Sequence, residues 1–216
     1  MTYRAVVFDF DYTLGESTDG IVSNANTAFE RMGLPKRSVD EVRVTIGHPV
    51  DVAYSMMTGD SDPGRMALFK KHFVDAALAV PVDPARMYPE AVRAVKQLSH
   101  RGYSLGIVTT KYSSRTWPIM ERYGVRRFID EIIGSDDVKT PKPDPEGLLM
   151  MSERLGVPMD QILYVGDTLV DEQAASAAGC DFVAVLTGFG PEGRFDGKRC
   201  RAVIPDMSHL IETMGL

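Results

Sequence analysis

The sequence predicts an α/β fold in which a mostly parallel sheet, covered by helices, is interrupted by an all-helical insertion. Short apolar runs alternate with helical patterns over most of the chain, and this alternation is typical of a doubly wound sheet. The alternation stops between about residues 17 and 83, where helical patterns follow one another. Paired acidic residues directly follow the first apolar run. Open α/β folds bind ligands at that edge of the sheet.

Five runs are predicted to be buried strands, because they are rich in apolar and β-branched residues and end at turn signals. They cover residues 5–10, 103–110, 128–135, 161–167 and 180–187. Helical patterns cover residues 89–102, 114–124, 144–156 and 168–179. Several of these patterns end at a Gly, which is favoured just past the last helical residue. We therefore expect an α/β core made of residues 1–16 and 84–216.

The insertion is predicted to be a helical cap domain over residues 17–83. Its helical patterns cover residues 22–33, 50–59 and 64–80, with no strong strand pattern between them. Because the insertion follows the first strand, it would begin at the carboxyl edge of the sheet. The sequence therefore predicts a lid over the ligand site.

Composition excludes several classes of function. The chain of 216 residues has a net charge of -6 and a pI near 5.3, so we expect neither nucleic acid nor an anionic membrane surface as a partner. No apolar run approaches the roughly eighteen residues of a membrane span, and the first residues do not form a signal peptide. A cytoplasmic protein is expected. Cys180 and Cys200 lack metal-ligand spacing and are predicted to be reduced packing residues.

Two carboxylates, Asp9 and Asp11, stand at the end of the first predicted strand. Strand geometry points both to one side and Phe10 to the other. Such a pair can attract Mg²⁺, which prefers carboxylate oxygens, and can divide the roles of nucleophile and general acid/base. The alternative is an Asp pair that caps a turn.

Phosphate-binding candidates follow the next predicted strand and a later loop. Thr109 ends its strand and can donate its hydroxyl to a phosphate oxygen. The amides of Thr110 and Lys111 would open toward a helix N-terminus, which favours anions. Lys142 lies between two prolines and could hold a phosphate or a neighbouring Asp. The alternatives are a helix cap at Thr109 and a solvated loop lysine.

A second acidic pair, Asp167 and Asp171, follows the strand predicted over 161–167. A helical turn that begins near Thr168 would point both side chains into the same pocket. The alternative for Asp171 is an acid at a helix N-terminus, which the helix dipole favours. Asp136 and Asp137 are predicted to be loop or capping residues.

Four segments occur in an order that resembles the haloacid dehalogenase-like superfamily: FDFDYTL (8–14), IVTTK (107–111), KTPKPDP (139–145) and VGDTLVDEQAASAAG (165–179). The resemblance implies a Rossmann-like core with an inserted cap. It implies that Asp9 attacks phosphorus, and that Asp11 acts as general acid and base and contacts the metal through its carbonyl. It further implies Asp167 as a metal ligand and Asp171 as a partner of a metal-bound water or of Lys142.

Departures from the family pattern lie beside the catalytic motifs and in the insertion. Many members carry Gly or Ser where this chain has Tyr12, and Asn where it has Thr110. Tyr12 is predicted to be a packing residue. The segment IGHPVDVA (46–53) resembles a cap loop of phosphoglycolate phosphatase-like members that reaches the substrate. His48 and Arg43 are therefore candidates for substrate contacts.

The predicted function is that of a Mg²⁺-dependent phosphatase that acts on a small phosphorylated metabolite through an aspartyl phosphate. The chain is expected to be a monomer or a weak homodimer. Asp11 argues against dehalogenation, because a halide leaves without a proton. Two alternatives stay open: a phosphomutase of the β-phosphoglucomutase type, and a non-catalytic module that binds a phosphorylated ligand.

Overall fold

The computed structural model describes residues 3–188, 195 and 197–215. It divides the chain into two compact units. One unit comprises Met1–Glu16 and Arg86–Leu216, and the other comprises Ser17–Ala85. Each unit is described by itself.

The first unit is built on a six-stranded sheet in the order β5-β4-β1-β6-β7-β8. Every pair of neighbouring strands is parallel. The strands are β1 (Ala5–Phe8), β4 (Ser104–Val108), β5 (Glu131–Ile133), β6 (Ile162–Gly166), β7 (Asp181–Val185) and β8 (Cys200–Ile204). The predicted α/β fold with a parallel sheet is confirmed.

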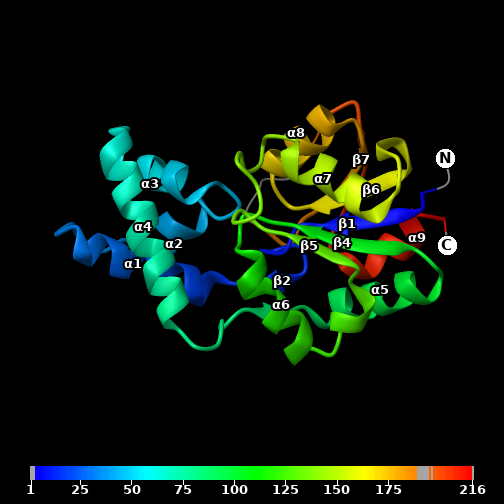
Figure 1. Ribbon diagram of the computed structural model, residues 1–216, viewed down its shortest axis with the longest axis horizontal. Helices are drawn as coiled ribbons and strands as arrows, with labels where there is room; N and C mark the ends of the chain where they lie inside the picture. Colours follow the sequence, from blue (N-terminus) through cyan, green and yellow to red (C-terminus); the bar gives the residue numbers. More distant parts are fainter. Residues whose placement is uncertain (1–2, 189–194, 196, 216) are drawn as a thin grey trace. The chain divides into compact units, whose positions relative to one another are not determined.

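Helices cover both faces of this sheet (Figure 1). One face carries α7 (Glu146–Leu155) and α8 (Leu169–Ala178). The other carries α5 (Pro89–His100), α6 (Ser113–Arg122), a 3-10 turn at Met207–His209 and α9 (Leu210–Thr213). The central strands are completely buried, which explains why they read as continuous apolar runs rather than alternating ones.

Three details of the sheet differ from the sequence prediction. Strand β5 is shorter than the predicted 128–135, because a 3-10 turn occupies Arg126–Phe128. Strand β8 was not predicted; it is an edge strand whose first four residues alternate between partial burial and exposure, and only its last residue is buried. A two-stranded ribbon of β2 (Gly15–Glu16) and β3 (Arg86–Met87) was also missed, because pairs this short carry no periodicity.

The second unit is helical, with α1 (Thr18–Arg31), α2 (Val39–Arg43), α3 (Val50–Thr58) and α4 (Pro63–Ala79). Its core is an aromatic group in which the ring centroids of Phe29 and Tyr54 lie 4.8 and 5.2 Å from that of Phe69. Rings at such spacings pack favourably. The N-terminus of α2 is closed by a capping box between Ser38 and Glu41, which satisfies free backbone amides.

The structure bears on two expectations from composition, the state of the cysteines and the absence of a membrane span. Cys180 and Cys200 are both free thiols, the first buried and the second half-buried, as predicted. Among the described residues, no helix combines the length and apolar character that crossing a membrane would require.

Candidate active site

The candidate site lies at the carboxyl edge of the sheet, where three neighbouring strands end. Asp9 follows β1, Thr109 follows β4 and Asp167 follows β6, and β1 lies between the other two strands. The chain leaves β1 in one direction along the sheet and returns to its other side at β6, so the strand order reverses there. This reversal is where open α/β sheets bind ligands.

Lys142 donates hydrogen bonds to two of the predicted site residues and to a buried tyrosine. Its ammonium donates hydrogen bonds to Asp9 Oδ1 at 2.7 Å, to Asp171 Oδ1 at 2.6 Å and to the Tyr164 hydroxyl at 2.9 Å. The side chain is only 4% exposed. An ammonium has three N–H donors, so these contacts use all of them. The structure therefore pairs Lys142 with carboxylates rather than leaving it solvated.

Burial and neighbouring charges shift the pKa values of Asp9 and Lys142. Burial raises the pKa of Asp9 from its ordinary 3.8 to about 7; Lys142 opposes the rise, while Asp171 and Asp11 add to it. Burial disfavours the charged form of Lys142 as well, but the carboxylates of Asp171 and Asp9 outweigh it and raise the pKa of the lysine. Lys142 thus stays charged, whereas a further cation near Asp9 would favour the charged carboxylate.

Asp167 and Asp171 approach Asp9 closely: each of the three offers one carboxylate oxygen, and these oxygens lie within 4.8 Å of one another. Burial, followed by the charges of Asp171 and Asp9, raises the pKa of Asp167 well above its ordinary value. The Thr13 hydroxyl donates to Asp167 Oδ1 at 3.3 Å. Three buried carboxylates this close repel one another unless a cation or protons compensate them.

Asp171 has three hydrogen-bonding partners, Lys142, Tyr164 and Thr168. Its Oδ1 accepts from Lys142, and its Oδ2 accepts from the Thr168 amide at 3.1 Å and from the Thr168 hydroxyl. The Thr168 hydroxyl in turn accepts from the Asp171 amide, forming a capping box at the start of α8. Asp171 therefore both caps its helix and contacts Lys142, so the two alternatives raised by the sequence are not exclusive.

Asp11 lies beside a second lysine. Lys111 Nζ is 3.6 Å from Asp11 Oδ1, and both side chains are largely buried. The next residue, Tyr12, is buried and has a φ of 61°, a left-handed conformation that costs a bulky residue energy. Its carbonyl accepts a hydrogen bond from the Thr187 hydroxyl. The loop after β1 is therefore a tight turn that is anchored by Thr187.

The donor set fits a divalent cation. Asp9 Oδ2 and Asp11 Oδ1 are buried and have no hydrogen-bond donor among the described residues. The four carboxylates of Asp9, Asp11, Asp167 and Asp171 are accompanied by two described ammonium groups, those of Lys111 and Lys142. Oxygen ligands with excess negative charge are the donors that Mg²⁺ selects. The three carboxylates whose oxygens lie within 4.8 Å of one another are those of Asp9, Asp167 and Asp171; the Asp11 carboxylate is not one of them.

The segment after β4 differs from the sequence prediction. The Lys111 amide donates to the Thr109 hydroxyl at 3.2 Å, so it is not open to an anion as expected. Helix α6 begins only at Ser113, and its N-terminal amide donates to Asp136 Oδ1 at 2.7 Å. The helix-cap alternative for Thr109 is wrong, because the amide at the N-terminus of α6 donates to Asp136, which lies in another loop.

The remaining predicted residues have local partners. Asp137 accepts from the Gly134 amide at 2.8 Å, so Asp136 and Asp137 are both loop or capping residues, as predicted. The Thr110 carbonyl accepts from the Ser135 hydroxyl at 2.7 Å. Arg43 lies 3.6 Å from Asp40. Arg43 and His48 belong to the helical unit, and their contact with a substrate stays a prediction.

Two residues were missed by the sequence analysis. In the sequence, Tyr164 is one residue of an apolar strand pattern. The only signal for a buried hydrogen bond is its hydroxyl, since a buried Tyr hydroxyl usually has a partner. Gly188 approaches Asp167 so closely that a Cβ there would lie 1.9 Å from Asp167 Oδ2. A Gly after a buried strand is the available signal for such a close approach.

This chain is similar in sequence and fold to known proteins. The family model described as haloacid dehalogenase-like hydrolase matches residues 6–185. A phosphoglycolate phosphatase of Salmonella choleraesuis (strain SC-B67) is 31% identical and one of Shigella boydii serotype 4 (strain Sb227) is 27% identical, each over 99% of this chain and 93% of the relative.

Among solved structures, a protein of Bacteroides fragilis described as haloacid dehalogenase-like hydrolase has 32% identity and a TM-score of 0.90. The match covers 97% of this chain and 100% of that protein. The family prediction made from the four ordered motifs is confirmed. The chain belongs to the haloacid dehalogenase-like hydrolase family, in its phosphoglycolate phosphatase-like branch.

Proposed function

We propose that this protein is a Mg²⁺-dependent phosphatase that hydrolyses a small phosphate monoester through a covalent phosphate on Asp9. The observation that carries the proposal is the environment of the Asp9 carboxylate. One oxygen is held by Lys142 at 2.7 Å, while the other is buried without a donor among the described residues. A fixed carboxylate with one oxygen free of hydrogen bonds is suited to nucleophilic attack.

The reaction has two balanced steps. In the first, an Asp9 oxygen bonds to phosphorus, the bond from phosphorus to the ester oxygen breaks, and protonated Asp11 supplies the proton that the leaving alcohol needs. In the second, Asp11 takes a proton from water, whose oxygen bonds to phosphorus while the bond from phosphorus to the Asp9 oxygen breaks, and inorganic phosphate is released. Asp9 is then restored as a carboxylate. The proximity of Asp11 and Lys111 (3.6 Å) supports an Asp11 held beside the reacting atoms.

The proposed residues that hold Mg²⁺ are Asp9, Asp167 and the backbone carbonyl of Asp11. When bound, the ion supplies positive charge that neutralises the phosphoryl oxygens and the surrounding carboxylates. Thr109, Thr110 and Lys142 are proposed to contact the phosphate. Lys142 has no spare N–H in this structure, so we infer that it acts on phosphate after its bond to Asp9 changes.

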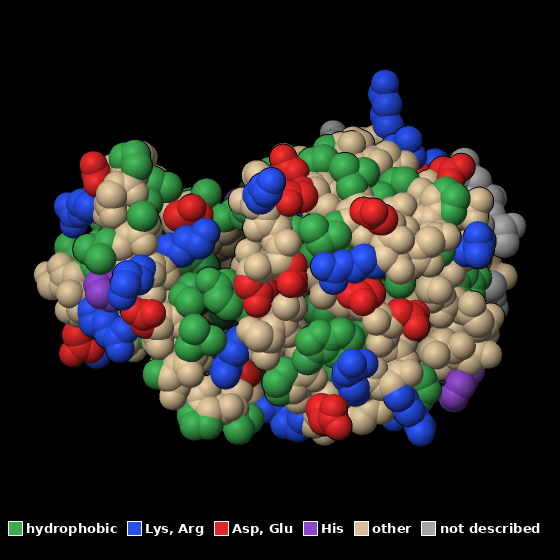
Figure 2. Space-filling model, in the orientation of Figure 1, with side chains coloured by type: hydrophobic (Ala, Val, Ile, Leu, Met, Phe, Trp, Pro, Cys, Tyr) green, Lys and Arg blue, Asp and Glu red, His purple; other side chains and the backbone are tan. Residues whose placement is uncertain are grey.

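The substrate is proposed to be a small phosphorylated metabolite, with phosphoglycolate as the first candidate because the relatives carry that name. The helical unit is proposed to act as the cap, with Arg43 and His48 as substrate contacts. On the face drawn in Figure 2, Lys and Arg side chains are interspersed with Asp and Glu, which does not favour nucleic acid as a partner. The cytoplasmic location and the monomer or weak homodimer stay predictions.

The test is phosphate release from 2-phosphoglycolate and a panel of other monoesters, with Mg²⁺ and with EDTA, for the wild type, Asp9→Asn and Asp160→Asn. Asp160 is exposed and serves as the matched control. We expect Mg²⁺-dependent release that falls by about a thousandfold or more in Asp9→Asn and is unchanged in Asp160→Asn, with both variants folded by circular dichroism.

Two results would change the assignment. Near-normal turnover of folded Asp9→Asn would remove Asp9 as the nucleophile. The mutase alternative would be favoured if the wild type released no phosphate from any monoester of the panel and isomerised a sugar phosphate in the presence of a bisphosphate. Tight binding of a phosphorylated ligand without either reaction would favour the binding module.

A further inference from the structure

A buried phenol connects three parts of the candidate site. Tyr164 lies on β6, is fully buried, and accepts a hydrogen bond from Lys142 at 2.9 Å. Its oxygen is also 3.0 Å from the carbonyl of Val108 and 2.9 Å from Asp171 Oδ1. A phenol has one proton to donate, so it donates to one of these two acceptors at a time.

The phenol stays protonated in this environment. Burial, followed by the charges of Asp171 and Asp9, raises the pKa of Tyr164 well above its ordinary value. The same hydroxyl therefore acts as an acceptor for Lys142 and a donor to strand β4 or helix α8. Val108 directly precedes Thr109, so the phenol links the strand end that carries Thr109 with Lys142 and Asp171.

The three acceptors around Lys142 fix its direction. Asp9 Oδ1, Asp171 Oδ1 and the Tyr164 hydroxyl each take one N–H. Rotation of the ammonium about its bond to Cε would break all three hydrogen bonds at once. If the phenol were absent, one N–H would be left buried without this acceptor, and the two carboxylates alone would hold the ammonium less rigidly. A buried polar network is most rigid when every donor and acceptor in it is satisfied.

We propose that Tyr164 is a positioning residue whose phenol holds the Lys142 ammonium against Asp9 and in register with the strand end at Thr109. Its effect on catalysis rests on the proposed phosphatase function. Its effect on Lys142 does not, because that depends only on the hydrogen bonds. Tyr164 is not expected to touch the substrate, since its hydroxyl is fully engaged within the protein.

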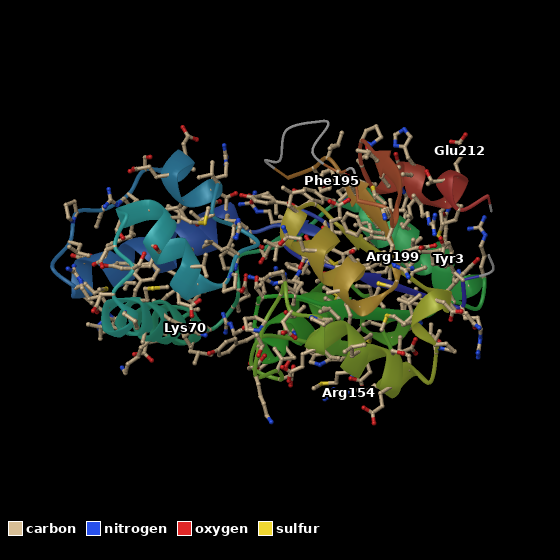
Figure 3. All side chains as sticks on the ribbon, turned by 90° about the horizontal axis from the view of Figure 1, so that it is seen from above. Tyr3, Lys70, Arg154, Phe195, Arg199 and Glu212 are labelled. Atoms are coloured by element: carbon tan, nitrogen blue, oxygen red, sulfur yellow. The ribbon has the colours of Figure 1, made fainter. Side chains whose placement is uncertain are left out.

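The kinetic test compares Tyr164→Phe with Tyr3→Phe. Tyr3 is the matched control, because its hydroxyl also donates to a carboxylate, Asp181 Oδ2 at 2.8 Å. It lies near Arg199 (Figure 3) at the amino ends of the strands, opposite the site. In Tyr164→Phe we expect kcat to fall about 10- to 100-fold, as small misplacements in active sites do. KM should change less than about threefold, because the Tyr164 hydroxyl itself does not contact the substrate.

The second measurement follows the Lys142 ammonium itself by ¹⁵N NMR of lysine-labelled protein, with the resonance assigned by its loss in Lys142→Arg. A buried ammonium with three acceptors should exchange its protons with water slowly in the wild type and in Tyr3→Phe. In Tyr164→Phe the same resonance should shift and its exchange should accelerate about tenfold or more. This measurement needs no enzymatic activity.

The outcomes separate the two proposals. A lower kcat together with an altered Lys142 resonance in Tyr164→Phe, and neither in Tyr3→Phe, supports the positioning role. A folded Tyr164→Phe with wild-type kcat and an unchanged resonance overturns it. If Tyr164→Phe does not fold, fast exchange of Lys142 in the wild type overturns it and slow exchange supports it. If the wild type releases no phosphate, the proposed function fails, and the NMR result alone decides on Tyr164.

Discussion

The ammonium of Lys142 lies 2.7 Å from Asp9 Oδ1, although the two residues are 133 positions apart in the chain. Both side chains are almost fully excluded from solvent, at 4% and 2% exposure. Removing both charged groups from water costs free energy, which their mutual attraction offsets. The loss of one partner therefore leaves the other charged group buried and uncompensated.

Replacement of Lys142 by Met should therefore lower both activity and stability. We expect the free energy of unfolding to fall by about 3–5 kcal/mol, the usual loss when one partner of a buried ion pair is removed. Urea denaturation in Mg²⁺-free buffer measures it. The matched control is Lys71→Met, which breaks an exposed pair with Asp75 at 2.8 Å and should lower the free energy of unfolding far less, because solvent screens an exposed pair. Equal losses in the two variants would contradict the structural role assigned to Lys142.

Replacement of Asp167 by Asn should weaken Mg²⁺ binding, because it removes one charge from the buried carboxylate group. A ligand at a hundred times its Kd stabilises a protein by about 2.7 kcal/mol. Thermal unfolding across a Mg²⁺ titration should show this stabilisation in the wild type and a clearly smaller one in Asp167→Asn. Asp160→Asn is the control. Identical titration curves for wild type and Asp167→Asn would remove Asp167 from the proposed ligands.

Replacement of Gly188 by Ala should disturb the same carboxylate without changing any charge. A Cβ at this position would lie 1.9 Å from Asp167 Oδ2, so Asp167 has to move. We expect Mg²⁺ affinity to fall about tenfold, as it does when groups that orient metal ligands are disturbed. Gly64→Ala is the matched control, because the nearest atom there is a side-chain oxygen of Asp62 at 3.2 Å. Wild-type Mg²⁺ affinity in folded Gly188→Ala would show that the backbone yields instead.

The stability of the metal-free protein should depend on pH through Asp9. Burial, opposed by Lys142, raises its pKa from 3.8 to about 7, so the folded state binds the proton more tightly than the unfolded state. The stability from this proton is fully present below about pH 4 and is lost as pH rises through about 7.

Denaturation in EDTA at several pH values measures this effect as the difference between the wild type and Asp9→Asn. The amide does not titrate, so the wild type should lose unfolding free energy relative to the variant between pH 4 and 7. Added Mg²⁺ should reduce this loss, because a cation favours the charged carboxylate. A difference that stays constant over this range would rule out a raised pKa at Asp9.

The sequence by itself determined the α/β class and the family. Alternating apolar and helical patterns depend only on how each element is buried, and burial leaves a period in the residue order. The motifs around Asp9, Thr109, Lys142 and Asp167 follow strands or stiff loops, so their order along the chain predicts that they meet at one edge of a parallel sheet. Strand β8, at the exposed edge, lacked such a pattern and was missed.

Only the tertiary structure decided which atoms bond to which. The Tyr164 hydroxyl bonds to Lys142, Val108 and Asp171, at separations of 22, 56 and 7 residues, whereas in the sequence it is one aromatic residue in an apolar run. Asp136, which lies in a different loop, accepts a hydrogen bond from the Ser113 amide at the N-terminus of α6. A hydrogen bond depends on distances of a few tenths of an ångström between distant segments, and no periodicity along the chain records such distances.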